Sequence, residues 1–216
     1  MNAAVSNLRT AINHTESLVG EIARHVTGSP VGDTDRERLS RLLWQQVIED
    51  GLAIPALVER RYLGSARALV RPQFEALVRS AWVRVRATDN QLSRYSDGTR
   101  APDGIASLVQ MLSAHSTGWT VQGVRIPFDS LWAKVGHAFH DTAHRGTRAI
   151  ARLALANQGS EDHVADDEIV VLYLAGSCAG IAGTALLDSA GRGDLANTAW
   201  ERTDQFMKAL EQSIQD

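Results

Sequence analysis

The sequence predicts an all-α fold, a helical bundle of about six to eight helices with a polar, loop-rich insertion near residues 88–127. Apolar residues recur at three- and four-residue intervals through most of the 216-residue chain, which is the spacing of one buried helix face. No stretch has the alternating pattern of a half-buried strand, and Gly, Pro and Ser clusters separate the periodic stretches. At this length we treat residues 1–216 as a single helical domain.

The first two predicted helices follow directly from this spacing. Residues 2–27 form an amphipathic pattern, and the Gly and Pro residues of 28–32 end it. A second helix starts at Asp33 or Thr34, because either side chain can accept hydrogen bonds from the amides of a first helical turn. Its apolar pattern continues to Tyr62.

Two features suggest breaks in the following stretch. Gly51 and Pro55 are expected to kink or split the second helix, since proline lacks a backbone donor and crowds the preceding turn. Gly64-Ser65 marks a turn and a cap. A third helix is then predicted over residues 66–87.

The polar insertion is predicted to contain two short helices. One lies within residues 88–104, which are polar and end in turn-forming dipeptides. The other spans residues 105–115, and residues 116–127 follow as a loop. A long helix over residues 131–157 then carries three of the seven histidines of the chain.

Residues 169–187 carry no charge and are about long enough to span a bilayer. The segment is rich in small residues, and acidic residues flank it without a basic anchor. We therefore predict no membrane contact but a helix buried at the centre of the bundle, capped by Asp166 or Asp167 and running to Ala190. A closing helix is predicted over residues 195–214.

Three glycines, Gly176, Gly180 and Gly183, lie on nearly one face of this central helix. Glycines at such spacing allow a second helix to approach until the backbones touch. The approaching helix could belong to the same chain or to a second copy. We expect a crossing within the chain, and separately a homodimer, because flat Gly-rich faces and exposed tryptophans favour self-association.

The composition narrows the classes of function. The formal net charge is −3, with 44% hydrophobic and 22% charged residues, so any contact with nucleic acid must come from a local basic patch. The single cysteine, Cys178, excludes an internal disulfide and a multi-cysteine zinc site, and its apolar neighbours predict an inert buried thiol. Residues 1–10 lack the pattern of a signal peptide, so we expect a cytoplasmic protein.

Three of the seven histidines, His137, His140 and His144, fall on one face of the predicted helix over residues 131–157. The first and last are about 10.5 Å apart along a helix, too far to share one ion without bending it. A metal bound by one adjacent pair, with Asp141 or Glu75, remains an alternative. So does a phosphohydrolase of the HD type at His140-Asp141. We predict neither a resident metal nor a cofactor.

A second polar cluster lies on the third predicted helix, where Arg71, Glu75 and Arg79 follow at i, i+4 and i+8. They can form two intrahelical ion pairs on a solvated face. They can also border the core and face the histidines, where arginine and histidine across a groove would bind a phosphate and move a proton.

Two motifs resemble those of an uncharacterised bacterial family. One is residues 69–82, which contain Arg71-Pro72-Gln73-Phe74-Glu75, and the other is residues 140–146, His-Asp-Thr-Ala-His-Arg-Gly, with Trp132 between them. Family members pair an Arg-Pro-x-Phe-Glu helix with a Thr-His-Gly-Gly-like helix start. Such proteins are similar to HEPN domains, all-helical bundles that often dimerise and include metal-independent ribonucleases. The resemblance therefore implies a HEPN-like bundle.

Two hypotheses for function follow. In the first, the protein binds RNA or a nucleotide phosphate and cuts RNA without metal, with His140, His144, Arg71, Glu75 and Arg79 as catalytic residues. His137, Asp141 and Arg145 complete the binding residues in this hypothesis. In the second, the same residues form a buried polar network in a dimerisation module, or in one that binds an unknown protein partner, and the protein is no enzyme.

Overall fold

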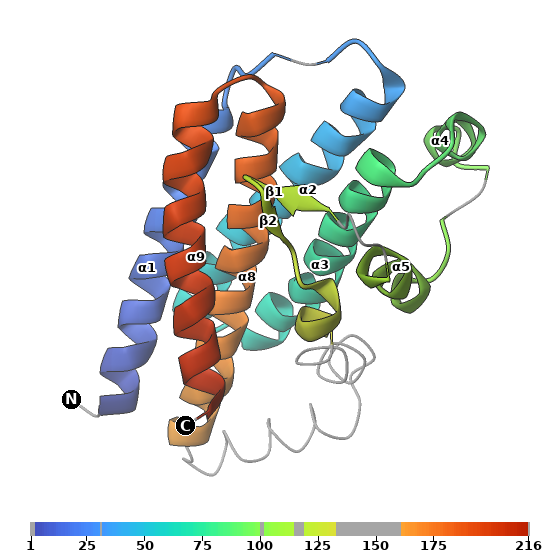
Figure 1. Ribbon diagram of the computed structural model, residues 1–216. Helices are drawn as coiled ribbons and strands as arrows, with labels where there is room; N and C mark the ends of the chain where they lie inside the picture. Colours follow the sequence, from blue (N-terminus) through green and yellow to red (C-terminus); the bar gives the residue numbers. More distant parts are fainter. Residues whose placement is uncertain (1–2, 31, 100–101, 115–118, 133–160, 216) are drawn as a thin grey trace.

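The structure, a computed structural model, describes residues 3–30, 32–99, 102–114, 119–132 and 161–215, and it confirms the all-α fold (Figure 1). The helices are α1 (Ala3–Val26), α2 (Asp35–Glu59), α3 (Leu63–Val85), α4 (Asp89–Ser96), α5 (Ile105–Ser113), α8 (Glu161–Ser189) and α9 (Gly193–Gln215). Two short strands, β1 (Thr120–Val121) and β2 (Val124–Arg125), pair antiparallel. The predicted polar insertion thus holds α4, α5 and this hairpin.

Helix α8 is the centre of the bundle, as its composition predicted. It packs against α1, α2, α3 and α9 (Figure 1). Residues Glu168–Ser189 have a mean hydropathy of 1.9 and are long and apolar enough to cross a membrane, and 78% of this window is buried inside the fold. Its apolar side chains are therefore covered by neighbouring helices of the same chain.

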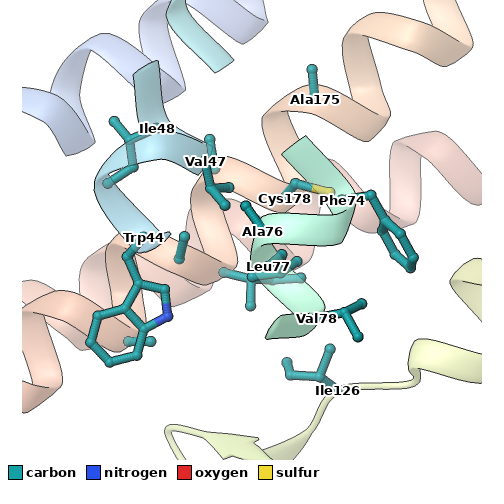
Figure 2. Packing of buried hydrophobic residues seen from close by; sticks show 14 of the residues in the cluster. Trp44, Val47, Ile48, Phe74, Ala76, Leu77, Val78, Ile126, Ala175 and Cys178 are labelled. Carbon is teal, nitrogen blue, oxygen red and sulfur yellow. The ribbon is translucent and has the colours of Figure 1, made fainter. Parts of the chain in front are cut away.

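One part of the core joins α2 and α3 to α8. Figure 2 shows Val47 and Ile48 of α2, Leu77 of α3 and Cys178 of α8 in one cluster of buried side chains. Leu77 and Val47 are 0% exposed and Cys178 is 1% exposed. Burial of these apolar side chains is the main force that holds α2, α3 and α8 together.

The start of α2 is the predicted one. Thr34 is the N-cap, and its hydroxyl accepts a hydrogen bond from the amide of Glu37 while the Glu37 carboxylate accepts from the backbone of Thr34. Of the two effects predicted for Gly51 and Pro55, a split does not occur, because α2 is one element across both residues, and a kink stays a prediction. Gly51 instead lies where α2 meets α8, since an added Cβ would come within 2.7 Å of Ala179.

The turn between α2 and α3 comes earlier than predicted. Arg61 has a left-handed backbone (φ 63°), and the amides of Arg61 and Tyr62 donate to the carbonyls of Val58 and Leu57, at 2.9 and 2.8 Å. This pattern closes a helix C-terminus and usually has glycine at the left-handed position. Arginine occupies it here, so Gly64-Ser65, which the sequence suggested as the turn, lies inside the first turn of α3.

Two further predictions are corrected. Residues 120–125, predicted as loop, form the hairpin of β1 and β2, whose turn residues Gln122 and Gly123 both have positive φ. Two such residues form the hairpin turn that suits the twist of paired strands, and Gly123 adopts this backbone without strain. Helix α8 begins at Glu161, before the predicted caps Asp166 and Asp167. An acidic pair before an apolar run therefore did not mark the start of this helix.

The glycine face of α8 packs within the chain, as expected. A Cβ added at Gly176 or Gly180 would collide with Phe206 or Thr203 of α9. A Cβ added at Gly183 would collide with Ile22 of α1. The small residues therefore allow α8 to approach two helices closely.

Asp50 of α2 is an ionisable group in the buried interior. It is 7% exposed, its Oδ1 accepts a hydrogen bond from Gln46 at 3.1 Å, and its buried Oδ2 has no hydrogen-bond partner among the described residues. Burial raises the pKa of this carboxyl above its ordinary value, and the charge of Glu49 raises it further. The folded protein therefore binds the Asp50 proton more tightly than the unfolded chain.

We expect Asp50→Asn to raise the melting temperature relative to wild type at pH 7. The unfolded carboxyl ionises near pH 3.9, so the burial penalty is absent below that pH and grows as the pH rises through the elevated folded pKa. The gain in Asp50→Asn should accordingly vanish near pH 4. Thermal melts of both proteins from pH 4 to 8 measure the difference, with exposed Asp33→Asn as the control. A difference that is constant with pH would contradict the assignment.

Candidate functional site

A row of charged residues on α3 is the described part of the predicted site. Glu75 accepts hydrogen bonds from Nε of Arg71 and from a terminal nitrogen of Arg79, each at 2.8 Å. The two arginine side chains are 30% exposed, and that of Glu75 is 15% exposed. The structure thus brings these three predicted residues together as two intrahelical ion pairs, at the border between core and solvent.

Arg67 continues the row by one turn toward the start of α3, and sequence reasoning missed it. It forms an ion pair with Glu168 of α8, whose side chain is 0% exposed, while that of Arg67 is 12% exposed. The four-residue step from Arg67 to Arg71 was a usable signal, but the carboxylate partner comes from a distant part of the chain. We call Arg67, Arg71, Glu75 and Arg79 the α3 charged row.

Gln73 fixes the rotation of α3 that presents this row. Its side chain is 0% exposed, and its Nε2 donates to the carbonyl oxygens of Val47 in α2 and Ala175 in α8, each at 3.0 Å. Residues two apart in a helix point about 200° apart, at 3.6 residues per turn. With Gln73 held against α2 and α8, Glu75 lies on the opposite side of α3.

An aromatic contact joins α3 to the segment that precedes the histidines. The ring centroids of Phe74 and Trp132 are 6.0 Å apart, with an angle of 17° between the rings. Phe74 is 0% exposed, so the contact forms part of the core. Trp132 is the last described residue before residue 161, and His137 follows it by five residues in the sequence.

The histidine half of the predicted site lies outside the described residues. This applies to His137, His140, Asp141, His144 and Arg145. Their position relative to the α3 charged row therefore stays a prediction.

Among the described residues, no group of three or more His, Cys, Asp or Glu side chains is arranged to hold a metal ion. Cys178 is 1% exposed, and burial raises the pKa of its thiol to about 12. The thiol is therefore protonated at neutral pH, and the prediction of an inert buried cysteine is confirmed.

A pocket of about 270 Å³ lies at the other end of α3, and sequence reasoning did not identify it. Its walls include Trp44 of α2, Arg84 of α3, Trp119 beside β1, Thr120 of β1 and Asp188 of α8. These residues come from four separate parts of the sequence. No local motif could therefore have indicated that they share a cavity.

Comparison with known proteins identifies a family but no activity. The model of a protein family described as a family of unknown function matches residues 45–212, more than half of the chain. This span contains the α3 charged row and α8, and also the His-rich segment. No curated protein and no solved structure matches the chain.

Proposed function

The chain belongs to the family of unknown function DUF6988, and from its own residues we propose that it binds the phosphate groups of an RNA or a nucleotide at the α3 charged row. The observation that carries this proposal is that the Glu75 carboxylate accepts hydrogen bonds from the guanidinium groups of both Arg71 and Arg79, at 2.8 Å each. One carboxylate fixes two guanidinium groups while a net positive charge remains. Each arginine has five N–H donors, so both keep donors for phosphate oxygens.

Exposure and position support the same proposal. The side chains of Arg71 and Arg79 are each 30% exposed, so a ligand in solution can reach them. Gln73 anchors α3 on its other side, which prevents the row from rotating into the core. A preorganised pair of this kind loses less side-chain entropy on binding than two mobile arginines.

The finer proposal is a HEPN-like, metal-independent ribonuclease. One of His140 and His144 removes the proton of the ribose 2′-hydroxyl, whose oxygen attacks the adjacent phosphorus atom. The other protonates the 5′-oxygen as its bond to phosphorus breaks, which leaves a 2′,3′-cyclic phosphate. Arg71 and Arg79 stabilise the charge of the transition state, with Glu75 orienting them. His137, Asp141 and Arg145 add contacts to the substrate.

A second candidate is a non-enzymatic module that forms a homodimer or binds a protein partner. The favouring observation is that Arg71, Glu75 and Arg79 already bond to one another along one helix. Side chains that satisfy one another's hydrogen bonds in this way need no ligand, and they stabilise α3 itself. In this case the row contributes stability and has no ligand.

The test compares Arg71→Gln/Arg79→Gln with Arg60→Gln/Arg94→Gln. The control removes two exposed arginines, for whose side chains the described residues provide no hydrogen bond or ion pair, so both variants change the net charge equally. Fluorescence anisotropy with a mixed-sequence RNA oligonucleotide, and separately with a labelled nucleotide, distinguishes the two ligand sources. We expect Arg71→Gln/Arg79→Gln to weaken binding at least tenfold and to lower the salt dependence by about two phosphate contacts.

Equal affinity of both variants, or no binding by wild type, would contradict phosphate binding. The ribonuclease step is tested by His144→Ala in EDTA against the same RNA, after a thermal melt shows that the variant folds. Cleavage lost in folded His144→Ala supports the enzyme. The second candidate instead predicts that wild type neither binds nor cleaves RNA, that Arg71→Gln/Arg79→Gln lowers the melting temperature, and that light scattering gives twice the chain mass.

A further inference from the structure

The pocket near the hairpin lies between the ends of two helices. Arg84 is in the last turn of α3, Asp188 is in the last turn of α8, and Trp119 and Thr120 close the space from the side of β1. Figure 1 shows the hairpin beside α2, α3 and α8. With a volume of about 270 Å³, the pocket has room for a small organic molecule and not only for one water.

Its two charged residues have opposite signs and do not neutralise each other. Arg84 lies 5.9 Å from the centroid of the Trp44 ring, and no carboxylate among the described residues forms an ion pair with it. Asp188 accepts a hydrogen bond from Nε2 of Gln122 at 3.1 Å, which holds the carboxylate toward the hairpin. One cavity thus presents a guanidinium and a carboxylate that are more than 4 Å apart.

The end of α8 strengthens this separation of charge. At the end of α3, Arg36 donates to the carbonyl oxygens of Val83 and Ala87 and lies 3.5 Å from the carboxylate of Asp89, so it covers the exposed carbonyls there while its own charge is paired. At the end of α8, the helix dipole adds negative potential to the carboxylate of Asp188. The pocket is therefore positive beside α3 and negative beside α8.

Neutral hydrogen-bonding groups complete the pocket. Thr120 and Ser189 bring hydroxyl groups to its walls. Trp44 also lines the pocket and is 2% exposed.

The ring faces in the pocket are already occupied, which argues against a stacked planar ligand. Trp119 stacks on Trp44 with ring centroids 6.5 Å apart, and on Phe128 with centroids 5.9 Å apart. Arg84 lies over the ring of Trp44. Recognition must therefore come from the charges and the polar groups, and not from stacking.

We propose that this pocket binds a small zwitterion of the amino-acid type, with its carboxylate on Arg84 and its ammonium on Asp188. A simple anion would be repelled by Asp188 and by the end of α8, and a simple cation by Arg84. A ligand that carries both charges can pair with Arg84 and with Asp188 at the same time. The site is separate from the α3 charged row, because none of the four residues of that row is among those that line the pocket.

The test titrates each of the twenty common L-amino acids into the full chain by calorimetry, with tryptophan fluorescence as a second readout. Acetate and methylammonium are the probes that carry one charge each. We expect at least one amino acid to bind with a Kd on the order of 0.1 mM, and both single-charge probes to bind at least tenfold more weakly. Arg84→Gln and Asp188→Asn should each weaken binding at least tenfold. Arg60→Gln and Asp103→Asn, which change exposed residues elsewhere, should bind like wild type.

A third variant keeps the proposal testable if the charge variants do not fold. Ser189 is exposed at the wall of the pocket, so Ser189→Leu should obstruct the space without disturbing the core. We expect this variant to melt like wild type and to lose amino-acid binding. Four results would overturn the proposal: no binding by any amino acid, acetate or methylammonium binding as tightly as the best amino acid, wild-type affinity in the folded charge variants, or wild-type affinity in Ser189→Leu.

Discussion

Gly183→Val is expected to lower the free energy of unfolding by about 3 kcal/mol, the upper range for overpacking a tight core. A Cβ at Gly183 collides with Cγ2 of Ile22, and Cβ and Cγ1 of Ile22 lie 3.4 and 3.5 Å from it. Ile22 is 2% exposed, so its side chain has no solvent space to move into. Valine adds two further methyl groups to the same contact, and α1 must move away from α8 to admit them.

Gly20→Val is the matched control, because Gly20 also lies inside a helix but an added Cβ there meets nothing within 4 Å. Replacing this glycine should leave the stability within about 1 kcal/mol of wild type, since the change in helix propensity is small. Urea denaturation followed by circular dichroism measures both variants. If the two valine variants unfold at the same urea concentration, the close approach of α1 and α8 is wrong.

Arg67→Met is expected to cost about 3 to 5 kcal/mol, the range for removing one partner of a buried ion pair. The Glu168 carboxylate is 0% exposed and forms an ion pair with this guanidinium. Without Arg67 the carboxylate loses that compensation while water remains excluded from it. Methionine retains much of the length and apolar volume of the arginine side chain, so the expected loss is mainly electrostatic.

Two comparisons isolate this effect. Adding Glu168→Leu to Arg67→Met should recover at least half of the lost stability, because no charge then remains buried at this position. Arg9→Met removes a guanidinium whose bond to Glu59 is 2.6 Å long but exposed, with side chains 61% and 43% accessible. That variant should lose no more than about 1 kcal/mol. Equal losses in Arg9→Met and Arg67→Met, or no recovery in the double variant, would show that burial does not set the strength of the Arg67 pair.

The α3 charged row thus divides by exposure into two kinds of residue. Arg67 is almost covered and its partner is fully buried, so its expected role is to join α3 to α8. Arg71 and Arg79 are each 30% exposed and share Glu75, so they can keep their geometry and still meet a ligand. Loss of stability in Arg67→Met and loss of RNA binding in Arg71→Gln/Arg79→Gln are therefore separate expected results.

The helices and several of their ends could be predicted from the sequence, because short-range interactions decide them. The Thr34 cap needs only Glu37 three residues later, and the ion pairs of Glu75 need only arginines four residues away. The burial of α8 followed from its uncharged, small-residue composition. Where a local rule failed, distant contacts or an unusual residue decided the outcome: α2 continues through Pro55, and Arg61 takes the left-handed position that usually holds glycine.

The bundle of helices and the buried glycine-rich helix at its centre could be predicted from sequence patterns, since periodicity and composition act within one or two helical turns. The contacts between distant groups, in contrast, became known from the folded chain. It paired Arg67 with Glu168, placed Gln73 between α2 and α8, and brought Trp44, Arg84 and Asp188 to one pocket. Such contacts depend on how helices cross and rotate. Packing of the whole core sets those angles, and no single stretch of sequence encodes them.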